Sequence, residues 1–492
     1  MRVISALLGG IAFSSLAAVT YAVTAAPPLA GPGAPSANAS TDEISQACST
    51  LAKQLGEDKV HRQGILDYEY RQSVERSWNL QQSFYKPVCI VFPEETNDVV
   101  VAYQTIIENG LPYGVRSGSH GVAYGWCSTP GIFIDLQRMN KVEYDAKRGV
   151  AQLGPGNRWS RVYDILGEQN QTVIGGRVSD VGMGLMLNGG VSYISGEYGF
   201  ASTNFVEVEV VLPTGQLVVA TPTNKYKDLL WAMQTAGNSF GIVTQFTVKA
   251  HPLSTIDFLN EVKDPKAALT PTFDIINPPI GALVKPLAIF AFSYATPTPP
   301  PKIFDRLLNI PHISKDVRTR PYAGNGGMVH LWDGFGSIYG DAQSFRTQTH
   351  KLTKEVGRLA LAASRNLTKT LGTDVDTFSL SYDHIFANTI AISNKQGGTP
   401  YGFKAEPTTC ILYNVAYKAE LPTERKQNVL KVFNEHVDSV PSTGKFPLYL
   451  PYSGADQNAL QTYNNYDRFK SIKRKYDPKN FVQTHSGGPK FD

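Results

Sequence analysis

A six-residue loop in the first third of the chain contains residue types that could bind a ligand or react with one. The loop reads Arg116-Ser117-Gly118-Ser119-His120-Gly121 and follows a short strand-like run at 112–115. Its glycines and serines present backbone N–H groups and small hydroxyls, so a phosphate could lie against it without steric conflict. His120 is a candidate nucleophile or ligand. Taken alone, these residues are more simply interpreted as a surface turn that contains a histidine.

A second glycine-rich stretch begins at Gly182-Met183-Gly184 and continues through Asn188-Gly189-Gly190 to Gly196-Glu197-Tyr198-Gly199. A dinucleotide fingerprint requires a strand before the glycines, a helix after them and an acidic residue about 20 positions later. Here more glycine follows the first pair, so a nicotinamide site is rejected. Glycines clustered in this way are interpreted as letting the backbone approach a ligand closely.

Two further patterns are weaker. Gly237-Asn238-Ser239-Phe240-Gly241 matches the nucleophile elbow of hydrolases, but a helix-like segment precedes it and a β-branched run follows it. This is the reverse of the required order, so a serine hydrolase is not favoured. Tyr449 and Tyr452 lie in a run at 445–452 that predicts a strand. Either could act as a base only if a neighbouring positive charge or a flavin lowered its pKa.

The elements around the first loop form a readable βαβ unit. A short apolar strand is predicted at 88–92, a helix begins near 93–96 and ends at Gly110, and the next strand occupies 112–115. The loop therefore leaves the C-terminal end of a strand, where ligand sites concentrate in α/β architecture. Further on, the pattern predicts two hairpins, 142–144 with 150–153 and 204–212 with 217–220, and a strand at 242–250.

Beyond about residue 251 the glycine clusters thin out. Predicted strands such as 287–294 and 411–417 alternate with predicted helices such as 352–367 and 424–440. This pattern indicates an antiparallel sheet with covering helices, and hence a second domain. A charged helix is predicted at 458–476.

The N-terminus is typical of a secreted protein. A positive start, an apolar run of small residues and a small-residue cleavage site predict a signal peptide at 1–25, followed by a Pro/Gly/Ala/Ser linker at 26–40. A single membrane anchor is the alternative to this interpretation. Three N-glycosylation sequons, at Asn38, Asn170 and Asn366, agree with secretion.

The four cysteines fit an oxidising compartment. Cys48 and Cys89 bracket the first folded segment, which favours their pairing, whereas Cys127 and Cys410 could pair or stay reduced. Their spacing fits no metal site. The net charge is +4, with no basic tract beyond Lys473-Arg474-Lys475, which argues against nucleic acid or an anionic membrane as partner.

Taken together, these motifs resemble the berberine-bridge-enzyme-like FAD-linked oxidases of fungal type, within the vanillyl-alcohol-oxidase superfamily. The resemblance covers nearly the whole mature chain. It rests on 86–93, on the loop 116–120, on Asn188 to Tyr193 with Gly196 to Gly199, on 204–215, on Gly241-Ile242 within 240–244, and on 466–478 with Asn480-Phe481.

The resemblance implies an α+β fold, with a two-subdomain PCMH-type FAD-binding domain and a substrate domain above the flavin. It implies that the pyrophosphate lies against the Arg116–Ser119 backbone, that His120 bonds covalently to the flavin 8α-methyl, and that Cys48 pairs with Cys89. The predicted cofactor-binding residues are Arg116, Ser117, Gly118, Ser119, His120, Gly121, Gly182, Gly189, Gly190, Tyr193, Gly196, Tyr198, Gly199, Gly241, Ile242, Asn480 and Phe481.

The departures from the family pattern also carry predictions. Val178 stands where bicovalent members have a flavin-linking cysteine, so a single histidyl link is expected. Tyr452 matches a tyrosine that is a base in some relatives, but its usual Asn neighbour is Pro451. The base therefore stays open between Tyr452 and Tyr449, and no metal is expected.

The resemblance divides the chain into the N-terminal part of the FAD region (41–82), the FAD-binding domain (83–254), the substrate domain (255–450) and a segment that returns to the FAD domain (451–492). The expected protein is a secreted oxidase that removes hydride from a small molecule, with dioxygen as acceptor and hydrogen peroxide as product. The substrate is a secondary-metabolite alcohol or amine, or a carbohydrate. A dehydrogenase that reacts poorly with oxygen and a non-catalytic ligand-binding glycoprotein are the alternatives. No nucleic-acid or membrane partner is expected, and a monomer is favoured.

Overall fold

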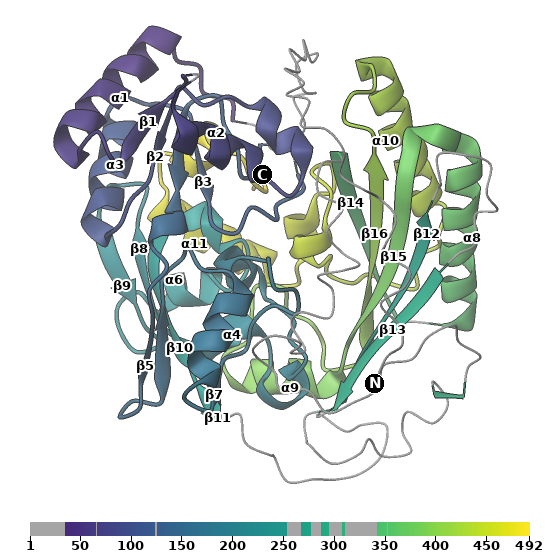
Figure 1. Cartoon of the computed structure of the whole chain (residues 1–492). Coiled ribbons are helices and arrows are strands. Elements are labelled where there is room, and N and C mark those ends of the chain that lie inside the picture. The colour runs from purple at the N-terminus through teal and green to yellow at the C-terminus, as the bar shows by residue number, and fades with distance from the viewer. Residues whose placement is uncertain are drawn as a thin grey trace, which may run out of the picture.

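The computed structural model describes residues 35–252 except 65 and 124, together with 267–276, 287–294, 308–309 and 342–492 except 352. The predicted signal peptide and most of the linker lie outside these residues. Within these residues there are three main sheets with covering helices, and the third sheet stands beside the first two (Figure 1). The helices are α1 (Thr41–Leu55), α2 (Tyr68–Glu75), α3 (Thr96–Glu108), α4 (Trp159–Gly167), α5 (Ser195–Tyr198), α6 (Lys227–Ala232), α8 (Lys354–Leu371), α9 (Ala387–Lys395), α10 (Thr423–Asp438), α11 (Tyr466–Tyr476) and α12 (Phe481–His485).

The first sheet carries the predicted βαβ unit. Its strand order is β1 (Val60–Arg62), β2 (Cys89–Val91), β4 (Ile132–Asp135) and β3 (Tyr113–Arg116). Strands β2 and β3 both run parallel to β4, and α3 connects them. Apolar residues of α1 and α3 share one core with these strands, so each helix turns an apolar face to the sheet. The six-residue loop therefore leaves the C-terminal end of β3, as predicted.

The second sheet is antiparallel and contains both predicted hairpins. Its order is β5 (Val142–Asp145), β6 (Val150–Leu153), β10 (Ile242–Lys249), β8 (Phe205–Val211) and β9 (Leu217–Ala220). A small two-stranded sheet joins β7 (Gln171–Thr172) to β11 (His251–Pro252). Helices α4 and α6 contribute to the core on this sheet.

In the third sheet, strand β15 (Val375–Ile385) has one apolar face and one polar face. The strand order of this sheet is β13 (Leu287–Tyr294), β12 (Ala267–Ile276), β15, β16 (Thr408–Tyr417) and β14 (Ala342–His350), all antiparallel. Phe378, Leu380 and Tyr382 of β15 are buried in a core with α8 and α10, which cover the outer side (Figure 1). Because side chains alternate along a strand, Ser381 and Asp383 lie on the opposite, inner face.

The C-terminal segment returns to the first two sheets. Helix α11 packs on α6, where Lys475 forms an ion pair with Asp228 at 2.6 Å, and Ser486 forms a parallel bridge with Tyr113 of β3. The charged helix predicted at 458–476 is two elements, the 3₁₀ turn η10 (Ala459–Thr462) and α11.

The strand predicted at 445–452 is wrong. The segment is irregular and ends in a 3₁₀ turn, η9 (Leu450–Tyr452). Pro447 and Pro451 each lack an N–H, so this segment could not supply a regular ladder of hydrogen bonds to a neighbouring strand. Tyr449 and Tyr452 consequently lie on a turn rather than on a pleated strand.

The cysteines separate into two kinds. Cys48 of α1 forms a disulfide with Cys89 of β2, as predicted, and Cys127 and Cys410 are buried free thiols. Of the helices in the described part of the chain, none is long and apolar enough to cross a membrane. The predicted α+β class, with an antiparallel second domain covered by helices, is confirmed.

Candidate active site

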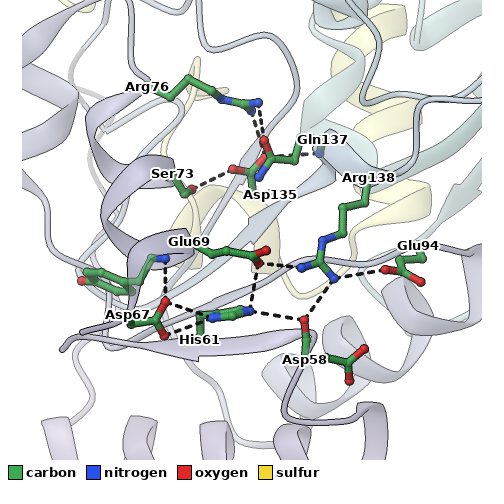
Figure 2. A network of polar contacts seen from close by, with 11 residues as sticks. Asp58, His61, Asp67, Glu69, Ser73, Arg76, Glu94, Asp135, Gln137 and Arg138 are labelled. Atoms are coloured by element: carbon green, nitrogen blue, oxygen red, sulfur yellow. Dashed lines mark hydrogen bonds and ion pairs between the residues drawn. The ribbon is translucent and has the colours of Figure 1, made fainter. Parts of the chain in front are cut away.

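Arg116, the last residue of β3, holds the base of the six-residue loop. Its guanidinium is buried and donates to the carboxylate of Asp135 and to the hydroxyl of Ser73. Figure 2 shows the other partners of this carboxylate, with Ser73 donating at 2.7 Å and Arg76 lying at 3.2 Å. The Arg116 side chain is therefore engaged with the sheet, which leaves only its backbone to face a ligand in the loop.

The ion pair sets the charge of Asp135. Burial by itself would raise the pKa of this carboxyl, but the two neighbouring guanidinium groups and the hydrogen bonds hold its pKa below the usual value. In the same region Arg138 donates to Glu69 at 2.6 Å and to Glu94 at 3.1 Å, which joins α2 to the end of β4 (Figure 2).

Asp135→Asn is expected to destabilise the protein by about 3–5 kcal/mol, because it leaves a buried guanidinium without a countercharge. The lowered pKa also sets a pH dependence. The stabilisation is present above the unfolded-state pKa of about 4 and is lost as the pH falls through the lower folded-state pKa. Denaturant unfolding between pH 3 and 7 measures both effects. The control is Asp467→Asn at an exposed position in the first turn of α11, and an equal loss in both variants would contradict the assignment.

The two glycine-rich stretches meet at Gly118 and Gly182. A Cβ added to either residue would overlap the backbone of the other. Ser117 reinforces the junction, since its hydroxyl donates to the Pro155 carbonyl at 2.6 Å and accepts from the Met183 N–H at 3.1 Å. Glycine at both positions is what allows this approach, so the stretches predicted separately form one continuous surface.

Ser119 and His120 follow the junction and have unused polar atoms. Ser119 has a φ of 71°, an uncommon backbone conformation for a serine, and its hydroxyl is buried. Neither this hydroxyl nor the His120 Nε2 has a hydrogen-bond partner among the described residues. Burial lowers the pKa of the His120 imidazole to about 4, so the ring is neutral near pH 7. A neutral ring keeps an electron pair available for a bond.

These observations test whether the loops fit FAD. The junction excludes side chains larger than hydrogen, and the orphaned hydroxyl of Ser119 can donate to a phosphate oxygen. His120 Nε2 is a buried, neutral nitrogen without a partner. FAD would supply phosphate oxygens as acceptors for the Ser119 hydroxyl and a methyl carbon to which His120 Nε2 could bond. The residues therefore fit the cofactor that the sequence predicts.

A second cluster lies where the third sheet meets the loop after β7. Arg177 makes a bidentate pair with Asp383 of β15, at 2.8 Å and 2.6 Å. The same guanidinium donates to the Tyr452 hydroxyl at 3.0 Å, and that hydroxyl donates to Asp383. Asp383 is 2% exposed. Three segments far apart in the sequence therefore converge on one buried carboxylate.

The charges around Tyr452 do not give it the lowered pKa that the sequence analysis required of a tyrosine base. Burial first, and the charge of Asp383 next, raise the pKa of the Tyr452 phenol well above its ordinary value, and Arg177 only partly opposes them. The phenol is therefore protonated at any ordinary pH. The sequence made a tyrosine base conditional on a lowered pKa. Arg177 does not lower the pKa of Tyr452 below its ordinary value, because its positive charge is already paired with Asp383.

Tyr449 lies next to this cluster but has different neighbours. Its ring makes an edge contact with Tyr452 at 5.0 Å, and its buried hydroxyl faces the backbone N–H of Gly190. Gly189 has a φ of 88° and lies under the rings of Tyr449 and Tyr401. The pKa of Tyr449 is raised by burial, and Tyr452 is the tyrosine that contacts the carboxylate.

The other predicted site residues are distributed over several elements. Gly196, Tyr198 and Gly199 lie against α9, where Asn388 donates to the Gly196 carbonyl at 2.6 Å. Asn480 and Phe481 lie behind β3, with Phe481 stacked on Tyr113. The remaining predicted residues are Gly121, beside Cys127; Gly190, against Ala201; Tyr193, buried near Arg177; and Gly241 and Ile242, at the start of β10 against Val211.

Sequence reasoning missed Arg177 and Asp383. Asp383 could have been noticed as the end of the alternating run Ser379, Ser381, Asp383 on a strand whose other face is apolar. Arg177 carries no such signal, since a lone arginine in a loop usually faces solvent. Within the described residues, no group of three or more His, Cys, Asp or Glu side chains could hold a metal ion.

Comparison with known proteins places this geometry in a class. A family model described as an FAD binding domain matches residues 87–221, which contain both glycine-rich stretches. An FAD-dependent monooxygenase of Arthrobotrys oligospora is 27% identical over 89% of this chain and 88% of its own length. The berberine bridge enzyme of Eschscholzia californica superposes with a TM-score of 0.67 at 16% identity, covering 90% of this chain and all of its own. A chitooligosaccharide oxidase superposes with a TM-score of 0.66 at 18% identity, covering 91% of this chain and all of its own.

The chain is thus an FAD-dependent oxidoreductase, and its fold is the PCMH-type fold of the berberine-bridge-enzyme-like oxidases. The resemblance inferred from the ordered motifs is confirmed at the level of the FAD-binding domain, the fold and the enzyme class.

Proposed function

We propose that the protein is a secreted oxidase that removes a hydride from a C–H or N–H bond of a small organic substrate, with dioxygen as the electron acceptor. When bound, the flavin takes up the hydride, and its reoxidation by dioxygen yields hydrogen peroxide. The observation that carries this proposal is the buried contact between the Tyr452 hydroxyl and the Asp383 carboxylate at the inner face of the third sheet.

The proton of the substrate leaves through this pair. Tyr452 Oη accepts the proton from the substrate O–H or N–H group while its own proton moves to Asp383 Oδ2. The net result is one proton on Asp383 and a neutral phenol, so the tyrosine never needs to rest as a phenolate. Arg177 holds both partners in place through its bidentate pair and its hydrogen bond to Tyr452. A positioned acid or base of this kind contributes about 10²–10⁴-fold to a rate.

The cofactor is proposed to lie along the Gly118–Gly182 junction, with the pyrophosphate against the backbone of Ser117 to Ser119. His120 is proposed as the single covalent anchor, since its ring is neutral and its Nε2 has no partner among the described residues. The bond would replace one C–H bond of the 8α-methyl group and the N–H bond of the imidazole with a C–N bond, and dioxygen would take up the two protons and two electrons released as hydrogen peroxide. Val178 stands at the position where bicovalent members carry a flavin-linking cysteine, so that position has no thiol for a second link.

The substrate is proposed to be an alcohol, an amine or a carbohydrate with several hydrogen-bonding groups. Ser381 and Thr272 share a hydrogen bond of 3.0 Å on the inner face of the third sheet, and the amide oxygen of Asn414 is buried there without a partner in the described structure. Such a face favours a substrate that brings hydroxyl or amine groups of its own. One structural neighbour is a chitooligosaccharide oxidase, which agrees with a hydroxylated substrate.

Secretion and glycosylation are part of the proposal. The apolar N-terminal run supports a signal peptide, and Asn38, Asn170 and Asn366 of the three sequons are all exposed. We place the FAD-binding domain at 83–254 and the substrate domain at 255–450, with 451–492 returning to the former.

Anaerobic mixing of the purified protein with a panel of sugars, alcohols and amines tests the proposal, since a true substrate bleaches the flavin absorbance near 450 nm. Admitting air is then expected to restore the absorbance and release peroxide in a one-to-one ratio with the substrate consumed. Reduction without peroxide, reversed only by an artificial dye, would identify a dehydrogenase instead. A purified protein without flavin absorbance would identify a ligand-binding glycoprotein.

A further inference from the structure

A short segment before β2 connects the loop that carries His120 to the edge of the third sheet. The segment comprises Trp78, Asn79 and the 3₁₀ turn η1 (Leu80–Phe84). Asn79 and Gln82 are 0% and 1% exposed, although both side chains are amides. A buried amide must find hydrogen-bond partners within the protein, so the partners of these two residues show what the segment holds together.

The side chain of Gln82 is hydrogen-bonded to the segment that follows His120. Its Nε2 donates to the Gly121 carbonyl at 3.3 Å and to the Ala123 carbonyl at 2.7 Å. Its Oε1 accepts from the Gly125 N–H at 3.3 Å and from the Ser128 hydroxyl. An amide side chain has two N–H donors and two acceptor lone pairs. All four of these hydrogen-bonding positions of Gln82 are used by residues between 121 and 128.

Asn79 reaches in two directions. Its Nδ2 donates to the Val122 carbonyl at 2.7 Å, in the loop after His120, and to the Gln343 carbonyl at 3.1 Å. Its Oδ1 accepts from the backbone N–H of Gln343 at 3.1 Å, and Gln343 belongs to β14, the edge strand of the third sheet. Asn79 therefore bonds the flavin-side loop and the substrate-side sheet with one side chain.

Trp78 repeats this double contact through its ring. The indole stacks on His120 with 4.9 Å between ring centroids and an interplanar angle of 15°. It also makes an edge contact with Phe345 of β14 at 5.8 Å, and its backbone N–H donates to the Ser119 carbonyl at 3.2 Å. The segment thus fixes the plane of the His120 ring as well as the path of the chain on both sides of it.

We propose that Gln82 and Asn79 are positioning residues, Gln82 for the His120 loop and Asn79 for the distance between that loop and the substrate sheet. Neither residue needs to touch the reacting atoms. Gln82 holds residues 121–128 in the one path that keeps His120 stacked on Trp78, and Asn79 pins the edge of the sheet to the same path. The inference rests on the proposed function only where His120 is taken to carry the flavin.

The test compares Gln82→Met, which keeps the length of the side chain and removes all four hydrogen bonds, with Gln216→Met on an exposed loop as control. Amide hydrogen exchange is measured on peptides that cover residues 119–128. We expect exchange there to become faster by about tenfold or more in Gln82→Met, with other regions unchanged, because four bonds each contribute to closing the loop. The acid-stable flavin fraction is expected to fall at least about fivefold at an unchanged flavin content of the growth medium.

Asn79→Leu separates the two roles. Exchange is expected to quicken at the start of β14 and in residues 121–123, while the acid-stable flavin fraction stays within about twofold of wild type, since Gln82 still holds the loop. With a substrate from the screen, KM is expected to rise more than kcat falls, because the sheet that contacts substrate has lost its tie.

Should Gln82→Met fail to fold, Ser128→Ala removes a single bond to Oε1 and is expected to give a smaller change of the same kind. Unchanged hydrogen exchange at 119–128 in Gln82→Met, or in Ser128→Ala where Gln82→Met does not fold, would overturn the inference, whatever the flavin content. Wild-type protein that releases all its flavin in acid would overturn the covalent link alone and leave the exchange result to decide the role of Gln82.

Discussion

Tyr452→Phe is expected to lower the rate constant of flavin reduction by about 10²–10⁴-fold, the range that a positioned acid or base contributes. The substitution removes one oxygen and leaves the ring in its buried contact with Tyr449. Asp383 would keep its bidentate pair with Arg177, so the protein should fold, but the proton would have no group to pass through. Anaerobic stopped-flow reduction, with the substrate that the screen identifies, measures this step directly.

The matched control is Tyr449→Phe. Its hydroxyl faces the backbone of Gly190 rather than the carboxylate, so we expect a change of no more than about tenfold, the size of one lost neutral hydrogen bond. A large loss in Tyr449→Phe together with wild-type rates in Tyr452→Phe would assign the proton transfer to the other tyrosine.

The pH profile provides an independent test of the relay. Because burial and Asp383 raise the pKa of Tyr452, the wild-type rate should not increase towards pH 10 in the way that a phenolate base would require. Asp383→Asn removes the negative charge and leaves Arg177, which lowers the pKa of the phenol. This variant is therefore expected to be slow at neutral pH and to gain activity as the pH rises. A wild-type profile that climbs through pH 9–10 would contradict the relay and favour a simple phenolate.

His120→Ala is expected to abolish the acid-stable flavin completely. In wild type, precipitation with acid should leave the flavin in the protein pellet, whereas the variant should release all of it into the supernatant. His120 is the histidine whose ring stacks on Trp78 and whose Nε2 is buried without a partner among the described residues. The variant should still bind FAD, because the backbone of the Gly118–Gly182 junction does not depend on the imidazole.

His436→Ala on α10 is the control for this experiment, since this histidine lies on the outer side of the third sheet. It should keep a wild-type amount of flavin in the pellet. Free flavin in the wild-type supernatant would exclude a covalent link, and retained flavin in His120→Ala would assign the link to another residue. Because the anchor is expected to raise the flavin potential, the variant should also be reduced more slowly by the same substrate.

Local patterns were sufficient for much of the fold. The helix signal at 93–96 and the stop at Gly110 predict α3, and the alternation of Val206 to Val210 with the turn at Pro213 predicts the β8–β9 hairpin. The strand predicted at 445–452 was wrong because Pro447 and Pro451 interrupt its run of aromatic and aliphatic residues. An element that lacks two N–H donors cannot join a ladder, however suitable its side chains are.

The glycine-rich loops belong to the part that could be read from the chain. Only glycine tolerates the backbone-to-backbone approach of Gly118 and Gly182. The presence of glycine at both positions is therefore visible in the sequence. The position of His120 could also be predicted from the sequence, because it lies in the loop after the second strand of a βαβ unit. Ligand sites concentrate at the C-terminal ends of such strands.

The residues proposed for proton transfer, in contrast, are brought together only by tertiary packing. Arg177, Asp383 and Tyr452 are separated by some 200 and 70 residues, and no local pattern relates them. Whether Tyr452 has a raised or a lowered pKa depends on the balance of burial, one carboxylate and one guanidinium, and only the tertiary structure sets that balance. The amides of Asn79 and Gln82 are a similar case, because an amide in a sequence reads as surface until its burial is known. Residue types therefore indicated where a cofactor can bind, while the folded arrangement decided which side chains come together at the proposed cofactor and proton-transfer sites.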